Sequence, residues 1–183
     1  MRKLNTVLFI SCIALTIAAC KSEKQKAMET ISANEKILFN DTTKMLNEQI
    51  AAKQVQIYKN FAVKYPDDTL SPGYLFKAAD LATGIHKPKD AVDIYEIFLS
   101  KYANHAKAPT CLFMEGFVYD TAIRDKNKAV EKYKEFLAKY PDHQLAASAK
   151  ASLDQIEMGL SDEELIKMFE AKQDSIAKAK QGT

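Results

Sequence analysis

The sequence predicts an all-helical fold, a solenoid of about three helix pairs followed by a C-terminal capping helix. The chain of 183 residues has only five glycines and five prolines, and residues that favour helix dominate it. Long runs of alternating β-branched residues bounded by turns, which would indicate strands, do not occur in it. Three similar segments, IYKNFAVKYPDD, IYEIFLSKYANH and KYKEFLAKYPDH, begin at residues 57, 94 and 132. An internal repeat of this period indicates a solenoid.

The three segments share one aromatic pattern. Each has a tyrosine at its second position, and these lie 37 and 38 residues apart: Tyr58, Tyr95 and Tyr133. A phenylalanine follows three residues later and a second tyrosine four residues after that, a spacing that places the rings on one helix face. We therefore expect three helices near 51–65, 90–102 and 128–140. The rings expected in the core are Tyr95, Phe98, Tyr133 and Phe136.

A second repeated unit lies between these helices, in the segments SPGYLFKAADLA and APTCLFMEGFVY. Pro72 and Pro109 fall at first helical positions, where a missing N–H costs nothing. Ala79 in one segment matches Gly116 in the other, and a small residue there lets two helices approach closely. Pro88 again marks the start of a helix. The repeating unit is therefore two helices joined by short turns.

This unit resembles the tetratricopeptide repeat. The second helix of that repeat carries an alanine, an aromatic residue, a small or apolar residue and a proline at a spacing kept by Ala129, Tyr133, Phe136 and Pro141. In the first helix, Gly116 and Tyr119 match the glycine and tyrosine of the family. Leu75 and Leu112 stand at its tryptophan position, and Gln54 stands where alanine is expected. The resemblance covers about residues 35–157 and implies partner binding along a concave face lined by the first helices.

Both ends of the repeat domain, expected over residues 35–160, carry helix-start signals. Ser32 and Glu35 have the spacing of a capping box that opens a first helix containing Ile37, Leu38, Met45 and Leu46. Ser161 and Glu164 have the same spacing, with Leu160 and Leu165 placed as a hydrophobic staple. Residues 161–183 are therefore expected to form a capping helix and tail, the alternative being a solvated helix.

The N-terminus has the features of a secretory signal. A basic start at Arg2 and Lys3 precedes an apolar run over 7–19 that is short for a bilayer span. Its end, Ile17-Ala18-Ala19-Cys20, resembles the bacterial lipobox, which implies removal of residues 1–19 and acylation of Cys20. The alternative is an ordinary signal peptide with a chance cysteine. Residues 20–34 are expected to form a tether.

Location follows from the same resemblance. Repeats of this length behind a lipobox resemble outer-membrane lipoproteins of the barrel-assembly and Tol–Pal-associated type. Lys21 stands at the position where aspartate would suggest retention at the inner membrane, so we expect an outer-membrane anchor and a domain facing the periplasm. Loss of residues 1–19 reduces 26 basic residues to 24, equal to the 24 acidic ones, and there is no dense basic block with interleaved aromatics. Nucleic acid is therefore not expected as a partner.

Catalytic and metal-binding motifs are missing from the sequence, so we expect no enzyme activity and no cofactor. Cys111 is interpreted as a small buried residue rather than a catalytic thiol. His105 and His143 hold equivalent repeat positions, and Asp68 takes that place in the first copy. Stacked repeats are too far apart for one zinc ion to join such residues, so a polar turn between repeats is the preferred interpretation.

Aromatic residues beyond the core pattern are candidates for partner binding. Most of the segment LFMEGFVYD, residues 112–120, is expected in the core, but the rings cannot all share one stripe. Tyr74, Phe117 and Tyr119 are the candidates for the concave face. The leading hypothesis is a lipid-anchored, non-catalytic scaffold for a protein or peptide in the cell envelope. The alternatives are a glycan-binding or peptidoglycan-binding module and, less favoured, an enzyme accessory or an unrecognised hydrolase.

Overall fold

The computed structural model describes residues 22–39 and 47–159 and, further on, residues 164, 166–167 and 170–171. The elements in these ranges are helical, and they are α2 (Glu23–Phe39), α3 (Glu48–Lys64), α4 (Ser71–Gly84), α5 (Pro88–Lys101), α6 (Ala108–Val118), the π-helical turn η2 (Tyr119–Ile123), α7 (Lys126–Lys139) and α8 (Ala146–Met158). Within the described part there are no strands, so the expected all-α class is confirmed.

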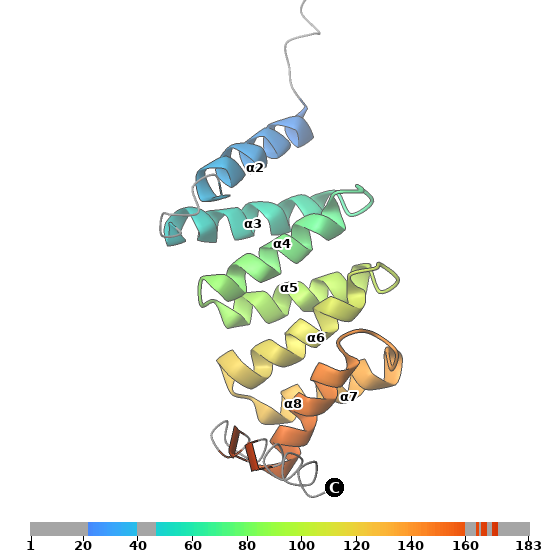
Figure 1. Ribbon diagram of the computed structural model, residues 1–183. Helices are drawn as coiled ribbons and strands as arrows, with labels where there is room; N and C mark the ends of the chain where they lie inside the picture. The colour runs from blue at the N-terminus through green and yellow to red at the C-terminus, as the bar shows by residue number, and fades with distance from the viewer. Residues whose placement is uncertain (1–21, 40–46, 160–163, 165, 168–169, 172–183) are drawn as a thin grey trace, which may run out of the picture.

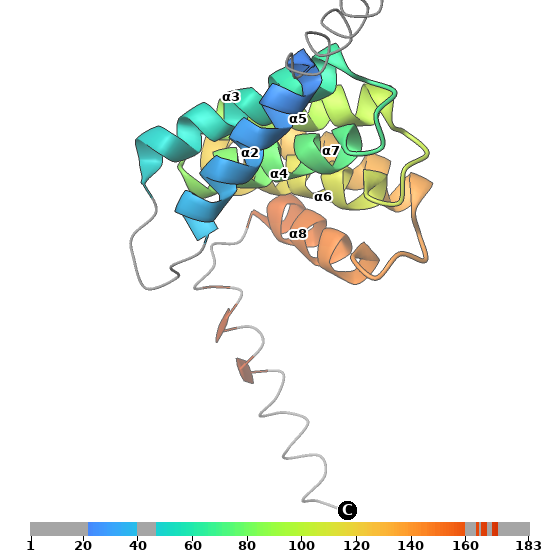
Figure 2. The same cartoon turned by 90° about the horizontal axis from the view of Figure 1, so that it is seen from above.

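The helices form three antiparallel pairs, α2/α3, α4/α5 and α6/α7, with α8 packed against α7. Figure 1 shows them stacked in chain order from α2 at one end to α8 at the other. Figure 2 looks along the stack and shows successive helices overlying one another. The expected solenoid of about three helix pairs is therefore confirmed, with α8 covering the last pair.

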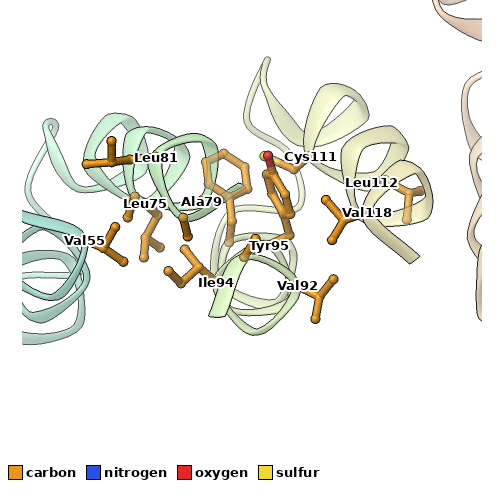
Figure 3. Close-up of a cluster of buried hydrophobic side chains, with 14 of the residues drawn as sticks. Val55, Leu75, Ala79, Leu81, Val92, Ile94, Tyr95, Cys111, Leu112 and Val118 are labelled. Carbon is orange, nitrogen blue, oxygen red and sulfur yellow. The ribbon is translucent and has the colours of Figure 1, made fainter. Parts of the chain in front are cut away.

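The repeated aromatic face forms the core between the helix pairs. Tyr95, Phe98, Tyr133 and Phe136 are all fully buried, as the spacing predicts. Small residues allow the close approach that these rings require: in Gly116, an added Cβ would lie 3.1 Å from the Tyr133 ring. Figure 3 shows one layer of this core, in which Tyr95 of α5 lies beside Cys111 of α6.

The three turns that connect successive pairs are built alike. The side chain at the repeated turn position accepts a hydrogen bond from the backbone N–H two residues on: Asp68 Oδ1 from Leu70 at 2.8 Å, His105 Nδ1 from Lys107 at 3.1 Å and His143 Nδ1 from Leu145 at 3.1 Å. The two imidazole rings also pack edge-on against Phe98 and Phe136. The interpretation of these residues as a polar turn between repeats is therefore confirmed.

The change of repeat length from 37 to 38 residues has a local cause. The starts of α4 and α5 are 17 residues apart, whereas the starts of α6 and α7 are 18 apart. The π-helical turn η2 ends in the αL residue Arg124, at φ 66°, whose N–H bonds the Tyr119 carbonyl. A π turn places one more residue in a helical turn than an α turn does. It therefore holds the extra residue without shifting α7 from its place in the stack.

The N-terminal helix begins earlier than expected. Helix α2 starts at Glu23, so Ser32 and Glu35 lie inside the helix and the expected capping box there is wrong. A capping box forms instead at Ser22 and Gln25, where the Gln25 N–H donates to Ser22 Oγ at 3.2 Å and the Ser22 N–H donates to Gln25 Oε1 at 3.1 Å. Residues 23–34, most of the expected tether, are helical.

Other expectations fall on residues outside the described ranges. The signal segment 1–19, Cys20, Met45 and Leu46 are among them, as are most of the capping box at 161–164, Leu160 and Leu165. None of the helices formed by the described residues is long and apolar enough to span a membrane.

Candidate functional site: the groove between α2 and α4

A groove of about 710 Å³ lies on the side of the stack where α2 and α4 face each other across Tyr58 of α3. Helix α2 contributes residues at i, i+3, i+4 and i+7, the spacing of one helix face, and α4 contributes a face of the same spacing. The lining residues are Ser32, Glu35, Lys36, Phe39, Tyr58, Lys77, Asp80, Leu81 and Gly84. The groove is thus lined by first helices of successive pairs, as expected for a concave binding face.

Glu35 holds the middle of the groove together. Its Oε1 accepts hydrogen bonds from the Tyr58 hydroxyl at 2.7 Å and from Lys77 Nζ at 2.6 Å, so that it joins α2 to both α3 and α4. Partial burial acts to raise the pKa of Glu35, but these two hydrogen bonds outweigh it and the pKa lies below its usual value. The Glu35 charge is therefore neutralised within the protein.

Asp80 also lines the groove, but its hydrogen-bond partner is neutral, whereas Glu35 also bonds a lysine. Its Oδ1 accepts a hydrogen bond of 3.0 Å from the hydroxyl of the buried Tyr95. Burial raises the pKa of Asp80, and the Tyr95 hydrogen bond and the charge of Lys107 only partly oppose this. Lys107 lies over the Phe76 ring, with Nζ 4.0 Å from the ring centre. Asp80 thus presents an exposed carboxylate that forms no ion pair with a cation in the described part of the chain.

Gln54 explains why the first pair differs from the next two. Alanine occupies the equivalent position in α5 and α7, at Ala91 and Ala129, and both are fully buried. Gln54 is also fully buried, and its Oε1 accepts a hydrogen bond of 2.9 Å from Asn34 of α2. The longer side chain requires more space between α2 and α3 than alanine does. Helix α2 is therefore held by polar contacts on one edge of the groove.

Phe39 provides the main exposed apolar surface of the groove. Its side chain is 52% exposed at the end of α2, while Leu81 on the opposite wall is 8% exposed. Tyr58 adds little free surface, because it is 1% exposed and its ring stacks on Tyr74 at 5.3 Å between centroids. Exposed aromatic rings beside partly buried polar groups are typical of sites where proteins bind each other.

The three aromatic candidates from the sequence lie in three different places. Tyr74 is half-buried on α4, where it packs against Tyr58 and Phe61 beside the groove. Phe117 is 38% exposed on α6 and occupies the repeat position that Asp80 has on α4. Tyr119 is 5% exposed, with its hydroxyl 3.4 Å from Lys128 Nζ of α7. Tyr119 therefore belongs to the packing of η2 against α7 and does not line the groove.

The cysteine expected in the core is there. Cys111 is fully buried, and burial raises the pKa of its thiol to about 12, which disfavours the reactive thiolate. In the described residues, no group of three or more histidine, cysteine, aspartate or glutamate side chains is arranged to hold a metal ion.

Comparison with known proteins identifies one part of the chain. A sequence model described as tetratricopeptide repeat matches residues 110–143, which run from the first turn of α6 through α7 to the following polar turn. A comparison with curated protein sequences finds no match. The chain therefore carries a tetratricopeptide repeat in an all-helical solenoid, and a repeat of this kind indicates a scaffold for protein–protein interaction.

Proposed function

We propose that this chain is a non-catalytic scaffold that binds a protein or peptide segment in the groove between α2 and α4. We further propose that acylation of Cys20 anchors it in the bacterial outer membrane, facing the periplasm, where it serves envelope assembly or maintenance. The observation that carries the binding proposal is the groove itself. It is about 710 Å³ in volume, with the exposed Phe39 ring on one wall and the carboxylate of Asp80 on the other.

The chemistry of the groove supports binding rather than catalysis. Catalysis needs polar groups that converge on one reacting atom, with a nucleophile or general base free to act. Glu35 is neutralised by Lys77, and the Tyr58 hydroxyl is engaged with Glu35. The buried Cys111 thiol lies in the core layer between α4, α5 and α6 rather than among the groove residues (Figure 3).

The start of α2 gives the proposed anchor a structural consequence. Ser22 caps the helix, and Cys20 precedes it by two residues, which can span at most about 7 Å. An acylated Cys20 would therefore hold the folded domain close to the membrane surface. The turns between successive pairs lie on the same side of the stack as the start of α2 (Figure 1), and this side would face the bilayer.

The groove proposal is tested by comparing two variants that each remove an exposed apolar side chain. Phe39→Ala changes the groove, whereas Val63→Ala changes a residue of α3 that is 48% exposed and does not line the groove. We expect both variants to keep the thermal midpoint of the parent and only Phe39→Ala to lose co-purified partner protein. Loss of the partner from Val63→Ala alone would show that the groove is not the binding face.

The anchor proposal is tested separately. Cys20→Ser removes the thiol that the lipid would occupy, so we expect an uncut or unacylated chain that no longer partitions with membranes. The measurement is the intact mass of the membrane-extracted protein, with Cys111→Ser as the control because Cys111 is buried in the fold. Unchanged mass and unchanged membrane partition in Cys20→Ser would refute acylation.

A further inference from the structure

We propose that the groove selects a peptide in which a lysine or arginine stands next to an apolar side chain, with Asp80 receiving the cation and Phe39 and Leu81 receiving the apolar group. This inference rests on the proposed function and adds to it the chemical class of the partner. The charges of the groove carry it.

Four charged side chains line the groove, and two of them, Glu35 and Lys77, neutralise each other. Lys77 Nζ lies 2.6 Å from Glu35 Oε1, so this pair presents no net charge to a ligand. Lys36 and Asp80 are both exposed, and they lie on opposite walls of the groove, Lys36 on α2 and Asp80 on α4. Asp80 is the acidic side chain available to a ligand, with one neutral hydrogen bond from the Tyr95 hydroxyl.

The surroundings of Asp80 favour a cationic partner. Tyr95 fixes Oδ1 from below, because its own ring is fully buried in the core. The Asp80 side chain is exposed to a ligand in the groove, its pKa is raised by neighbouring protein groups, and its one hydrogen bond within the protein comes from a neutral hydroxyl. A ligand ammonium or guanidinium would supply the charged partner that Asp80 does not have among the described residues, and charge-assisted hydrogen bonds are the stronger kind.

The apolar half of the site adjoins Asp80. Leu81 follows Asp80 directly, and Gly84 continues the same face of α4 with no side chain to fill the space. Phe39 closes the groove from α2 with about half of its side chain exposed. Successive side chains of an extended peptide point to opposite sides, so a cationic residue can face Asp80 on the α4 wall while the apolar residue next to it faces Phe39 on the α2 wall.

A peptide fits this arrangement better than a glycan does. Sugar rings stack on free aromatic faces beside carboxylates that accept hydrogen bonds from hydroxyl groups. Tyr58 has no free face, since Tyr74 stacks on it, and Glu35 is already occupied by Tyr58 and Lys77. Phe39 is the one groove ring with a large exposed surface.

The test uses the purified full chain and two fluorescein-labelled peptides, GSGKFLSGS and GSGEFLSGS, with fluorescence anisotropy as the readout. We expect the lysine peptide to bind about tenfold more tightly, which equals about 1.4 kcal/mol. Asp80→Asn keeps an acceptor for the Tyr95 hydroxyl and should reduce this preference to less than about twofold. Asp80→Lys should reverse it. Asp93→Asn is the control, because Asp93 is exposed on the outer surface between α3 and α5.

The possible failures separate the two proposals. Equal binding of both peptides, sensitive to Phe39→Ala but not to Asp80→Asn, would overturn the charge selection while leaving the groove as the binding site. Binding of neither peptide, or binding that Phe39→Ala leaves unchanged, would overturn the groove proposal itself. Displacement of the bound lysine peptide by a tetramer of N-acetylglucosamine, at a lower concentration than unlabelled peptide requires, would overturn the peptide assignment in favour of a glycan.

Discussion

The ion pair between Glu115 of α6 and Lys132 of α7 offers a sharp test of how the third helix pair is packed. Glu115 is fully buried, and its Oε1 lies 2.8 Å from Lys132 Nζ. No other hydrogen-bond donor of the described residues reaches either of its oxygens. Burial raises the pKa of Glu115, and Lys132 opposes this. Lys132→Met removes the contacting positive charge while keeping most of the side-chain volume.

The expected loss follows from this geometry. At an effective dielectric constant of about 20, two unit charges separated by this distance attract by about 6 kcal/mol, much of which offsets their desolvation. Removing one partner of a buried pair costs about 3–5 kcal/mol. The Lys132 side chain is 19% exposed, so water can partly take its place. We therefore expect Lys132→Met to lower the free energy of unfolding by about 3 kcal/mol at neutral pH.

The pH dependence has a definite sign. Without Lys132, the folded-state pKa of Glu115 lies still further above its unfolded value near 4.5, because desolvation is unopposed. The destabilisation is fully present above the folded-state pKa, and it shrinks as the pH falls through that pKa toward the unfolded value. Urea unfolding at about pH 7.5 and about pH 5 measures this change, and we expect the variant to recover part of its loss at the lower pH.

Two further variants act as controls. Lys134→Met breaks an exposed pair with Glu157, whose side chains are 58% and 49% exposed, and should cost about 0–1 kcal/mol. The second control copies the preceding pair, which has the fully buried Ala78 and Ile94 at the equivalent positions. Because replacing a whole buried ion pair with apolar residues is often neutral or stabilising, Glu115→Ala with Lys132→Ile should recover most of the loss. A cost of Lys132→Met no greater than that of Lys134→Met would refute the reasoning.

Three further predictions concern the core, a strained turn and the start of α2. Phe136→Ala should lower the free energy of unfolding by about 3–5 kcal/mol, because the ring is fully buried. Phe117→Ala should lower it by less than about 1 kcal/mol, because Phe117 is 38% exposed. Urea unfolding compares the two variants, and equal losses would contradict the assigned faces. Arg124→Gly should raise stability by about 0.5–1 kcal/mol, because Arg124 is in the αL region at φ 66°; a lower thermal midpoint would count against it. Ser22→Ala should weaken the cap of α2 by about 1 kcal/mol, seen as faster amide exchange in the first turn of α2 and not in α5.

The middle of the fold was predictable because its pattern is long and regular. Three copies of the aromatic face place α3, α5 and α7 within three residues of their expected starts, since a period sustained over several turns defines a helix and its buried side. Helix α2 was less predictable. Among its 17 residues only Ile31 and Leu38 are buried, so it has a weak apolar period. Asn34 and Glu35 of this helix hydrogen-bond to Gln54, Tyr58 and Lys77, residues 20–42 positions away, which no local pattern reveals.

A groove along the first helices was expected, but most of its lining residues were not, because one of its walls is α2. Ser22 and Gln25 carried the correct capping signal, but the similar spacing of Ser32 and Glu35 competed with it.

The misassignment of Tyr119 had a signal in the sequence. Residues two positions apart on a helix do not face the same way, so Phe117 and Tyr119 could not both line one face. In the sequence, the π turn that begins at Tyr119 is indicated only by the one-residue difference in length between the repeats.

The groove between α2 and α4 is the central claim, and site-specific photo-crosslinking in living cells tests it most directly. A benzoylphenylalanine residue replaces Phe39 in one strain and Val63 in another; both side chains are about half exposed, and only Phe39 lines the groove. We predict that the probe at position 39 captures a discrete protein partner after irradiation and that the probe at position 63 does not. Capture at position 63 with none at position 39 would contradict the account.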